Sequence, residues 1–315
     1  MALPRYAVVS PVRDEAEHFA RTANSMISQT HRPQRWVVVD DGSTDGTREI
    51  AESYAAEHDW IRVVELGTRT GRARGAPIVR AFEAGREALD ERPDFVSKLD
   101  GDLFVPAHYY EWVALTFERL PRAGIVGGVI LAWDGERWVP DAVGAHTVSG
   151  MVKAYRSDCL DEIGGLRQSM GWDGIDEYGA RARGWEVYPL PEVTILHFGL
   201  RGEKEPWRQS RWEEGVATHY MGYLWSWALV RAVYRGLWER PRVLGGLALW
   251  SGFAWSRLTR RPMVDDERAR AELRAEQRAR LRGLLRGRAS LGPAAIPGGG
   301  PAFWAGETAE AEYLP

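Results

Sequence analysis

The stretch VVVDDGSTDGT, residues 37–47, decides the fold. Three consecutive valines are typical of a strand that is buried on both faces, and they run directly into aspartates, glycines and hydroxyl side chains. Asp, Gly, Ser and Thr favour turns and helix N-caps, so the strand is expected to end where this polar run starts. The sequence therefore predicts a buried strand that delivers polar groups to one edge of a sheet.

Short β-rich runs and amphipathic helical stretches alternate around this strand. Strands are predicted over 6–12, 35–42, 61–66 and 94–102, and helices over 15–30, 47–58 and 76–90. Such a βαβα succession predicts an α/β fold with a mostly parallel, Rossmann-like sheet flanked by helices. Ligands of these sheets bind beyond the carboxyl ends of the strands, which is where residues 40–47 are expected to lie.

The chain is predicted to fall into three parts. Residues 1–205 carry the α/β pattern, residues 206–288 form a helical extension rich in Trp and Arg, and residues 289–315 are rich in Gly, Pro and Ala and are expected to be disordered. Residues 1–200 hold 22 Lys and Arg against 31 Asp and Glu, whereas residues 201–288 hold 19 against 10. The extension is therefore basic and favours an anionic partner surface.

Two interpretations of the extension are open. Its apolar runs are interrupted by arginines and are too short for a transmembrane helix. They fit either interfacial helices on an anionic membrane or helices packed on the catalytic domain with arginine stems covering apolar surface. The single cysteine, Cys159, excludes an intramolecular disulfide framework, and no secretory signal is recognised at the N-terminus. A cytoplasmic location is expected, with peripheral attachment to the inner face of the cell membrane as its variant.

Acidic side chains recur at the predicted strand and loop ends. They are Glu15, Asp40, Asp41, Asp100, Asp102, Asp173, Asp176 and Glu177. Asp100 and Asp102 close a hydrophobic strand with one glycine between them, so both can direct oxygens at one divalent cation and the phosphates that it carries.

The order of the motifs VVSPVRDE, VVVDDGSTDGT and LDGD, followed by an acidic loop before a helix that ends in RGW, resembles the family 2 glycosyltransferases with the nucleotide-sugar-binding fold called GT-A. The resemblance covers about residues 5–200. It implies that Pro11, Arg13 and Glu15 line the nucleoside pocket and that Asp41 hydrogen-bonds the base edge.

The same resemblance implies a metal site and a diphosphate site. Asp102 is expected to bind Mg²⁺ or Mn²⁺, and Asp100 to reach the ribose or the metal. His197 follows an extended run and stands either near the metal or in the core with one ring nitrogen bonded to the backbone. Arg72, or Arg74, either contacts the diphosphate or is exposed to solvent.

The resemblance also implies a catalytic base and an acceptor site. The family places an aspartate before the helix that follows the acceptor loop, and Asp173 lies eleven residues before Gly184, where that aspartate is expected. Asp176 is the alternative base. Trp172 is expected to contact the acceptor, as are Arg211 and Trp212, whose segment RQSRW resembles an acceptor-binding element of processive members.

The function expected from these features is inverting, metal-dependent transfer of a sugar from a nucleotide-diphosphate donor to a hydroxyl of a glycan or polyprenyl-linked acceptor, in cell-envelope or exopolysaccharide synthesis. A sugar-phosphate nucleotidyltransferase is one alternative, although the segment SPVRDEAEH is acidic where those enzymes have a basic, Gly-rich loop. A non-catalytic scaffold at the membrane is the other. Nucleic-acid binding is not expected, because the basic region contains no recognised module.

Overall fold

The computed structural model describes residues 3–67, 75–140, 146–199 and 206–286. Its strands are β1 (Tyr6–Val12), β2 (Arg35–Asp40), β3 (Ile61–Glu65), β4 (Phe95–Leu99), β5 (Leu103–Phe104), β6 (Ala123–Trp133), β7 (Trp138–Pro140), β8 (Val152–Arg156) and β9 (Glu186–His197). Its helices are α1 (Ala16–Ile27), α2 (Thr47–Glu57), α3 (Ala76–Glu87), α4 (Tyr109–Arg119), α5 (Ser157–Glu162), α6 (Trp172–Arg181), α7 (Trp207–Tyr220), α8 (Trp225–Trp238), α9 (Leu244–Leu258) and α10 (Glu267–Leu285). The predicted tail, residues 289–315, lies outside the described residues.

The sheet has the order β3-β2-β1-β4-β8-β6-β9-β5, and β7 pairs with β6. Strands β3, β2, β1 and β4 are parallel, as the βαβα pattern predicts. In the other half, β8 is antiparallel to both β4 and β6, and β6 is parallel to β9. The sheet is therefore mixed beyond β4, because the chain returns there through β8 instead of through a further βα unit.

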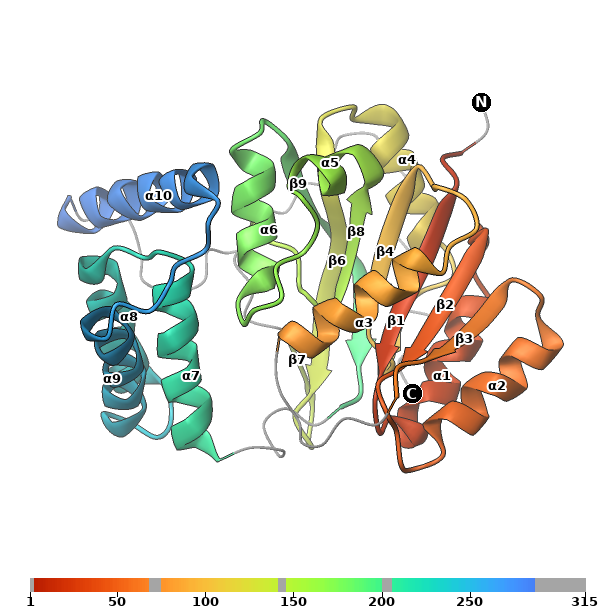
Figure 1. Cartoon of the computed structure of the whole chain (residues 1–315), viewed down its shortest axis with the longest axis horizontal. Helices are drawn as coiled ribbons and strands as arrows, with labels where there is room; N and C mark the ends of the chain where they lie inside the picture. Colours follow the sequence, from red (N-terminus) through yellow and green to blue (C-terminus); the bar gives the residue numbers. More distant parts are fainter. Residues whose placement is uncertain (1–2, 68–74, 141–145, 200–205, 287–315) are drawn as a thin grey trace.

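Helices cover both faces of this sheet (Figure 1). Helices α1, α2 and α4 contribute to one buried cluster, which includes Phe19, Ala51 and Val113. Helices α3, α5 and α6 contribute to the other, which includes Phe82 and Leu160. The four valines at positions 9, 37, 38 and 39 are fully buried between these layers, and their burial accounts for the apolar run before the polar edge.

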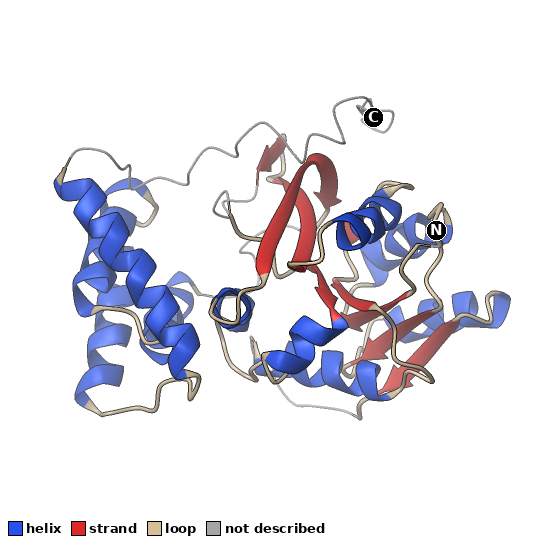
Figure 2. Ribbon diagram, turned by 90° about the horizontal axis from the view of Figure 1, so that it is seen from above, coloured by secondary structure: helices blue, strands red, loops and turns tan. Residues whose placement is uncertain are grey.

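Helices α7, α8 and α9 stand to one side of the sheet domain in both views (Figures 1 and 2). Helix α10 returns to pack on α6, where Asp266 lies 2.8 Å from Arg183. The side chain of Gln277 also accepts a 2.9 Å hydrogen bond from the amide of Leu224. Helix α10 thus joins the extension to the sheet domain. No helix in the described part is long and apolar enough to cross a bilayer.

Candidate active site

Three parallel strands end at one edge of the sheet. Strand β1 lies between β2 and β4, with Val12 opposite Asp40 and Val9 opposite Lys98. The loops after β1, β2 and β4 therefore begin side by side. Asp41 continues this pairing, since its amide donates to the carbonyl of Val12 at 3.0 Å.

The loops after β1 and β2 are bonded to each other. The carboxylate of Asp14 accepts the amide of Thr44 at 2.9 Å, and the hydroxyl of Thr47 accepts the amide of Glu15 at 2.8 Å. Asp45 accepts the amides of Ala16 at 3.0 Å and of Thr47 at 3.1 Å. Burial raises the pKa of Asp45, but the hydrogen bond from the hydroxyl of Thr47, together with these amide bonds, outweighs it and lowers the pKa below its usual value. The polar run after β2 thus holds the segment of Pro11, Arg13 and Glu15 in place.

The carboxylate of Asp41 is largely buried and is paired. Its Oδ1 accepts a 2.7 Å hydrogen bond from Nη2 of Arg80, which is on α3 and is half-exposed. The sequence did not predict the role of Arg80, because nothing in the pattern of an amphipathic helix indicates which loop one of its arginines contacts. A group that bonds Asp41 therefore shares this carboxylate with a guanidinium.

Lys98 organises the loop after β4. Its side chain is 1% exposed, and its ammonium donates to Oδ1 of Asp100 and, at 2.7 Å, to the carbonyl of Gly150. The amide of Asp100 donates to the carbonyl of Met151 at 2.9 Å. Burial raises the pKa of Asp100 above its usual value, although Lys98 opposes this change. Sequence reasoning missed Lys98, since a lysine inside a buried strand needs partners that only the fold reveals.

Asp102 and His197 meet at the same edge. Leu103 pairs with His197 between β5 and β9, and Nε2 of the histidine lies 3.0 Å from Oδ2 of Asp102. Burial raises the pKa of Asp102, but hydrogen bonding to His197 outweighs it and the pKa is lowered. The structure thus brings together two of the predicted metal ligands.

Gly199 packs closely against this pair. A Cβ built on Gly199 would lie 2.4 Å from Oδ2 of Asp102 and 2.9 Å from Nε2 of His197. Any larger residue at position 199 would therefore collide with both atoms. Among the described residues, no three His, Cys, Asp or Glu side chains form a group that could hold a metal ion. Asp102 offers a carboxylate oxygen and His197 a ring nitrogen, so a divalent cation held here would take its remaining ligands from a diphosphate and from water.

Asp173 stands in the first turn of α6 and is exposed. A Cβ on Gly150 would lie 2.8 Å from Cβ and 2.9 Å from Oδ2 of Asp173, so this glycine allows a close approach. Because Lys98 bonds the carbonyl of the same glycine, contacts run without a break from Asp100 through Lys98 and Gly150 to Asp173.

Asp176 lies one turn further along α6 and is buried. Lys153 contacts Asp176 at 3.0 Å and Glu177 at 3.0 Å, and the hydroxyl of Tyr155 donates to Asp176 at 2.6 Å. Burial raises the pKa of Asp176 and raises that of Glu177 to about 7, in both cases against the opposing charge of Lys153. The side chains of Asp176 and Glu177 are 1% and 2% exposed, so an acceptor cannot reach them. Their contacts with Lys153 and Tyr155 instead hold α6 against β8.

The predicted acceptor residues lie in different surroundings. Trp172 is 6% exposed within the buried cluster of α3, α5 and α6, with the ammonium of Lys98 5.5 Å from its ring centre. Arg211 is engaged inside the extension, at 3.0 Å from Glu214 and 2.6 Å from Glu239. The ring of Trp172 and the guanidinium of Arg211 are therefore both engaged within the protein and do not offer a contact to an acceptor. Arg72, the predicted diphosphate contact, lies outside the described residues.

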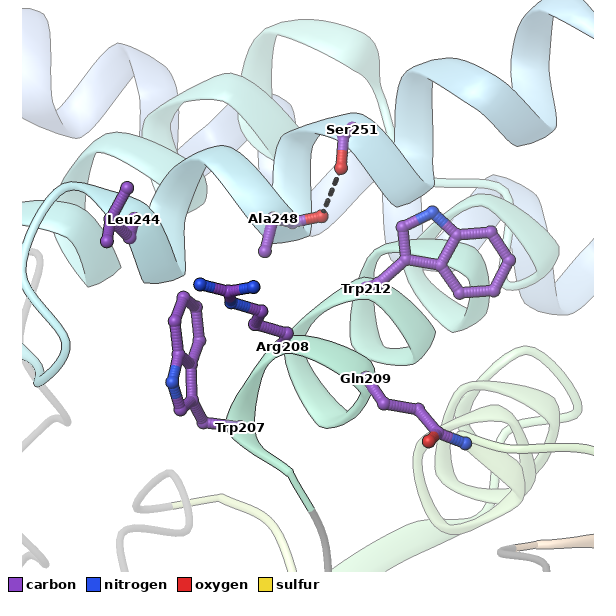
Figure 3. Close-up of a pocket in the computed structure, with 7 residues that line it drawn as sticks. All are labelled: Trp207, Arg208, Gln209, Trp212, Leu244, Ala248 and Ser251. Carbon is purple, nitrogen blue, oxygen red and sulfur yellow. Dashed lines mark hydrogen bonds between the residues drawn. The ribbon is translucent and has the colours of Figure 1, made fainter.

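Trp212 lines a shallow pocket of about 470 Å³ between α7 and α9. Figure 3 shows Trp207 and Arg208 at one end of this pocket, facing Leu244 and Ala248, and Trp212 further along α7. The guanidinium carbon of Arg208 lies 5.4 Å from the ring centre of Trp207. The segment RQSRW thus lines the pocket through Arg208, Gln209 and Trp212, and not through Arg211.

Comparison with known proteins agrees with this geometry. Residues 7–142 match the family described as glycosyl transferase family 2. Glycosyltransferase AglE of Haloferax volcanii is 38% identical over 131 residues, which are 40% of this chain and 39% of AglE. The chain spans less than half the length of each of the first curated relatives that it matches.

Solved structures share the fold at low sequence identity. TarS of S. aureus in complex with UDP-GlcNAc superposes with a TM-score of 0.58 and 17% identity, over 90% of this chain and 92% of that chain. The mannosyltransferase PcManGT of Pyrobaculum calidifontis, in complex with GDP-Man and Mn²⁺, gives a TM-score of 0.53 and 18% identity over 92% and 77%. Residues 7–142 therefore match glycosyl transferase family 2, and the sheet with its flanking helices has the GT-A fold.

Proposed function

We propose that the chain is an inverting, metal-dependent glycosyltransferase that moves a sugar from a nucleoside-diphosphate donor to a hydroxyl of a glycan or lipid-linked acceptor, in cell-envelope or exopolysaccharide synthesis. The observation that carries this proposal is the unbroken set of contacts from Asp100 to Asp173 beside the Asp102 and His197 pair. The donor class is supported by the UDP-GlcNAc and GDP-Man in complexes of the same fold.

The donor nucleoside would lie across the ends of β2, β1 and β4. Asp41 and Asp100 follow strands that are two places apart, so about 10 Å separates them across the sheet. This span suits a nucleoside whose base bonds Asp41 and whose ribose reaches Asp100. Pro11 lies near the end of β1, the strand between them, and Arg13 and Glu15 lie on the loop that follows it; all three would line the nucleoside pocket. Arg72 is retained as the diphosphate contact on the basis of its motif alone.

A divalent cation, Mg²⁺ or Mn²⁺, would be held by Asp102 and His197 together with the diphosphate. When bound, it would offset the negative charge that builds on the leaving diphosphate. The two side chains are 3.0 Å apart, and the cation would replace their mutual hydrogen bond.

Asp173 would act as the general base. The acceptor oxygen forms a bond to the anomeric carbon while the bond from that carbon to the diphosphate breaks, and the hydroxyl proton moves to a carboxylate oxygen of Asp173. A single displacement of this kind inverts the anomeric configuration. Asp173 can meet an acceptor because it is exposed, whereas the other candidate, Asp176, is buried against Lys153 and Tyr155.

Trp212 is the proposed acceptor contact on the extension. Its pocket also contains Gln209 and Arg208, so an apolar ring and polar groups are available to one ligand. The ion pairs of Arg211 leave that residue a structural role in the extension.

The test is the release of nucleoside diphosphate from UDP-, GDP- and dTDP-sugars, with and without Mn²⁺ and with lipid-linked or oligosaccharide acceptors. We expect metal-dependent release from at least one donor, lost in Asp102→Ala and kept in Asp59→Ala. Asp59 is a suitable control because it is exposed at the opposite edge of the sheet, before β3. Formation of pyrophosphate from a nucleoside triphosphate and a sugar phosphate would instead identify a nucleotidyltransferase and overturn the proposal.

A further inference from the structure

Large apolar side chains that are exposed gather on the helical extension. In the described part of the chain, thirteen such residues are found, and all of them lie between Trp207 and Leu285. The sheet domain, over the described part of residues 3–199, contributes none. Single exposed apolar residues are ordinary, but their concentration in one region of the molecule indicates an interaction surface.

Helix α8 carries one stripe of these residues along its whole length. Trp225, Leu229, Val233 and Leu237 recur every fourth position and are 57%, 40%, 52% and 53% exposed. Residues four apart lie on neighbouring turns of one helix face. The opposite side of α8 carries Arg231, which is directed at Glu214 of α7 at 2.6 Å.

Helix α9 carries a second stripe. Leu244, Leu247, Trp255 and Leu258 are 53%, 59%, 53% and 80% exposed and fall on one side of the helix. The other side packs on α7, where a Cβ on Gly252 would lie 2.1 Å from the carbonyl oxygen of Trp212.

The two stripes share one face. A Cβ on Gly246 of α9 would lie 2.3 Å from the carbonyl oxygen of Ala232 on α8, so these small residues bring the helices into backbone contact. At 3.6 residues per turn, these contact positions direct the stripes of α8 and α9 to the same side of the pair, opposite the positions that pack on α7. Leu244, at the edge of the α9 stripe, also lines the pocket beside Trp207. Figure 1 places α7 toward the sheet domain, so this α8–α9 face is the outer face of the molecule.

The charge of this region has one sign. Residues 224–264 contain seven arginines and one glutamate, Glu239. That glutamate is already paired with Arg211 and Arg235. Arg240 and Arg242 at one end of the helix pair, and Arg257 and Arg260 at the other, are exposed and form no ion pair with any residue that the structure describes. An apolar face with arginines at both ends is complementary to an anionic surface that has an apolar interior.

We propose that the α8–α9 face docks on an anionic phospholipid bilayer. Trp side chains suit the headgroup region, and each Arg near an anionic leaflet adds to the attraction. No described helix can span a bilayer, so the pair lies in the interface with its axes along the surface. A second copy of the chain is a poorer partner, because a two-fold contact would bring the same unpaired arginines against each other. The docking does not depend on the transfer reaction.

Vesicle flotation of the full chain tests the proposal. The wild type should float with vesicles of phosphatidylcholine mixed with phosphatidylglycerol and not with vesicles of phosphatidylcholine alone, and high salt should weaken binding. The double variant Arg240→Gln/Arg242→Gln should bind anionic vesicles roughly 30-fold more weakly, because each arginine near an anionic leaflet contributes about 1 kcal/mol of attraction. The affinity of Val233→Gln/Leu247→Gln for the same vesicles should fall at least tenfold, because two apolar side chains of the face are replaced by polar ones.

Matched controls lie on α10. Arg268→Gln and Leu285→Gln change an exposed arginine and an exposed leucine away from the face and should bind like the wild type. Circular dichroism and nucleoside-diphosphate release, measured on every variant, separate a docking defect from misfolding or from loss of transfer. Failure of the folded wild type to float with anionic vesicles would overturn the proposal. Equal flotation of the face and control variants would overturn it too, as would a stable dimer in sedimentation that both face variants dissociate.

Discussion

Replacing Asp173 by asparagine separates the proposed base from its neighbours. The side chain is exposed and packs on Gly150, so an isosteric amide should change the unfolding free energy by no more than about 0.5 kcal/mol. The amide cannot take the acceptor proton. We expect kcat to fall by about 10²- to 10⁴-fold, which corresponds to roughly 3–5 kcal/mol of transition-state stabilisation. Affinity for the nucleoside diphosphate and Mn²⁺ should not change.

Asp176→Asn is the matched comparison, three residues away on the same helix. It removes a buried charge that contacts Lys153 and Tyr155, but Lys153 keeps Glu177 at 3.0 Å. We therefore expect the unfolding free energy to fall by about 3 kcal/mol, which is the lower end of the range for breaking a buried ion pair. The Tm should be lower by several degrees. Transfer and nucleotide titrations are measured together with thermal unfolding. A folded Asp173→Asn that turns over like the wild type, beside a folded but inactive Asp176→Asn, would refute the assignment.

Three further predictions concern the groups that support the site. Gly150→Ala should reduce transfer and leave nucleotide affinity intact in a titration, because its Cβ would lie 2.8 Å from Cβ of Asp173 and displace the base. Lys98→Met should lower the unfolding free energy by about 3 kcal/mol in a denaturant titration, since it leaves Asp100 and the carbonyl of Gly150 without their buried donor. For Glu177, whose pKa burial raises from 4.5 to about 7, the folded state binds a proton that the unfolded state has lost between these values. The stability of the wild type should therefore fall as pH rises through this window, and Glu177→Gln should flatten the dependence of Tm on pH there. These roles would be contradicted by wild-type transfer in Gly150→Ala, by wild-type stability in Lys98→Met and by an unchanged pH dependence of Tm in Glu177→Gln.

Local patterns predicted the part of the fold that depends on local physics. The valines before Asp40 predicted a buried strand, and the strand ends predicted the edge at which Asp41 and Asp100 follow β2 and β4. The return of the chain through the antiparallel β8 was not predicted, because strand direction depends on contacts that are distant in sequence.

The supporting residues were the harder part of the site. Counting along α6 favoured Asp173 over Asp176, and only the fold reveals that Asp176 is buried against Lys153. Lys98 and Arg80 stand in a hydrophobic strand and an amphipathic helix, where their residue type alone does not indicate a partner. Arg211 matched a short motif, yet two glutamates from the extension satisfy its charge.

The most direct test of the central claim, that the acidic strand ends bind a cation and a nucleoside diphosphate together, is calorimetric titration of the wild type and Asp102→Ala with UDP and GDP, each with and without Mn²⁺. The wild type should bind at least one diphosphate, tenfold or more tightly when the metal is present, and Asp102→Ala should lose that gain. Binding that is equally tight without metal, or that survives unchanged in Asp102→Ala, would contradict the account.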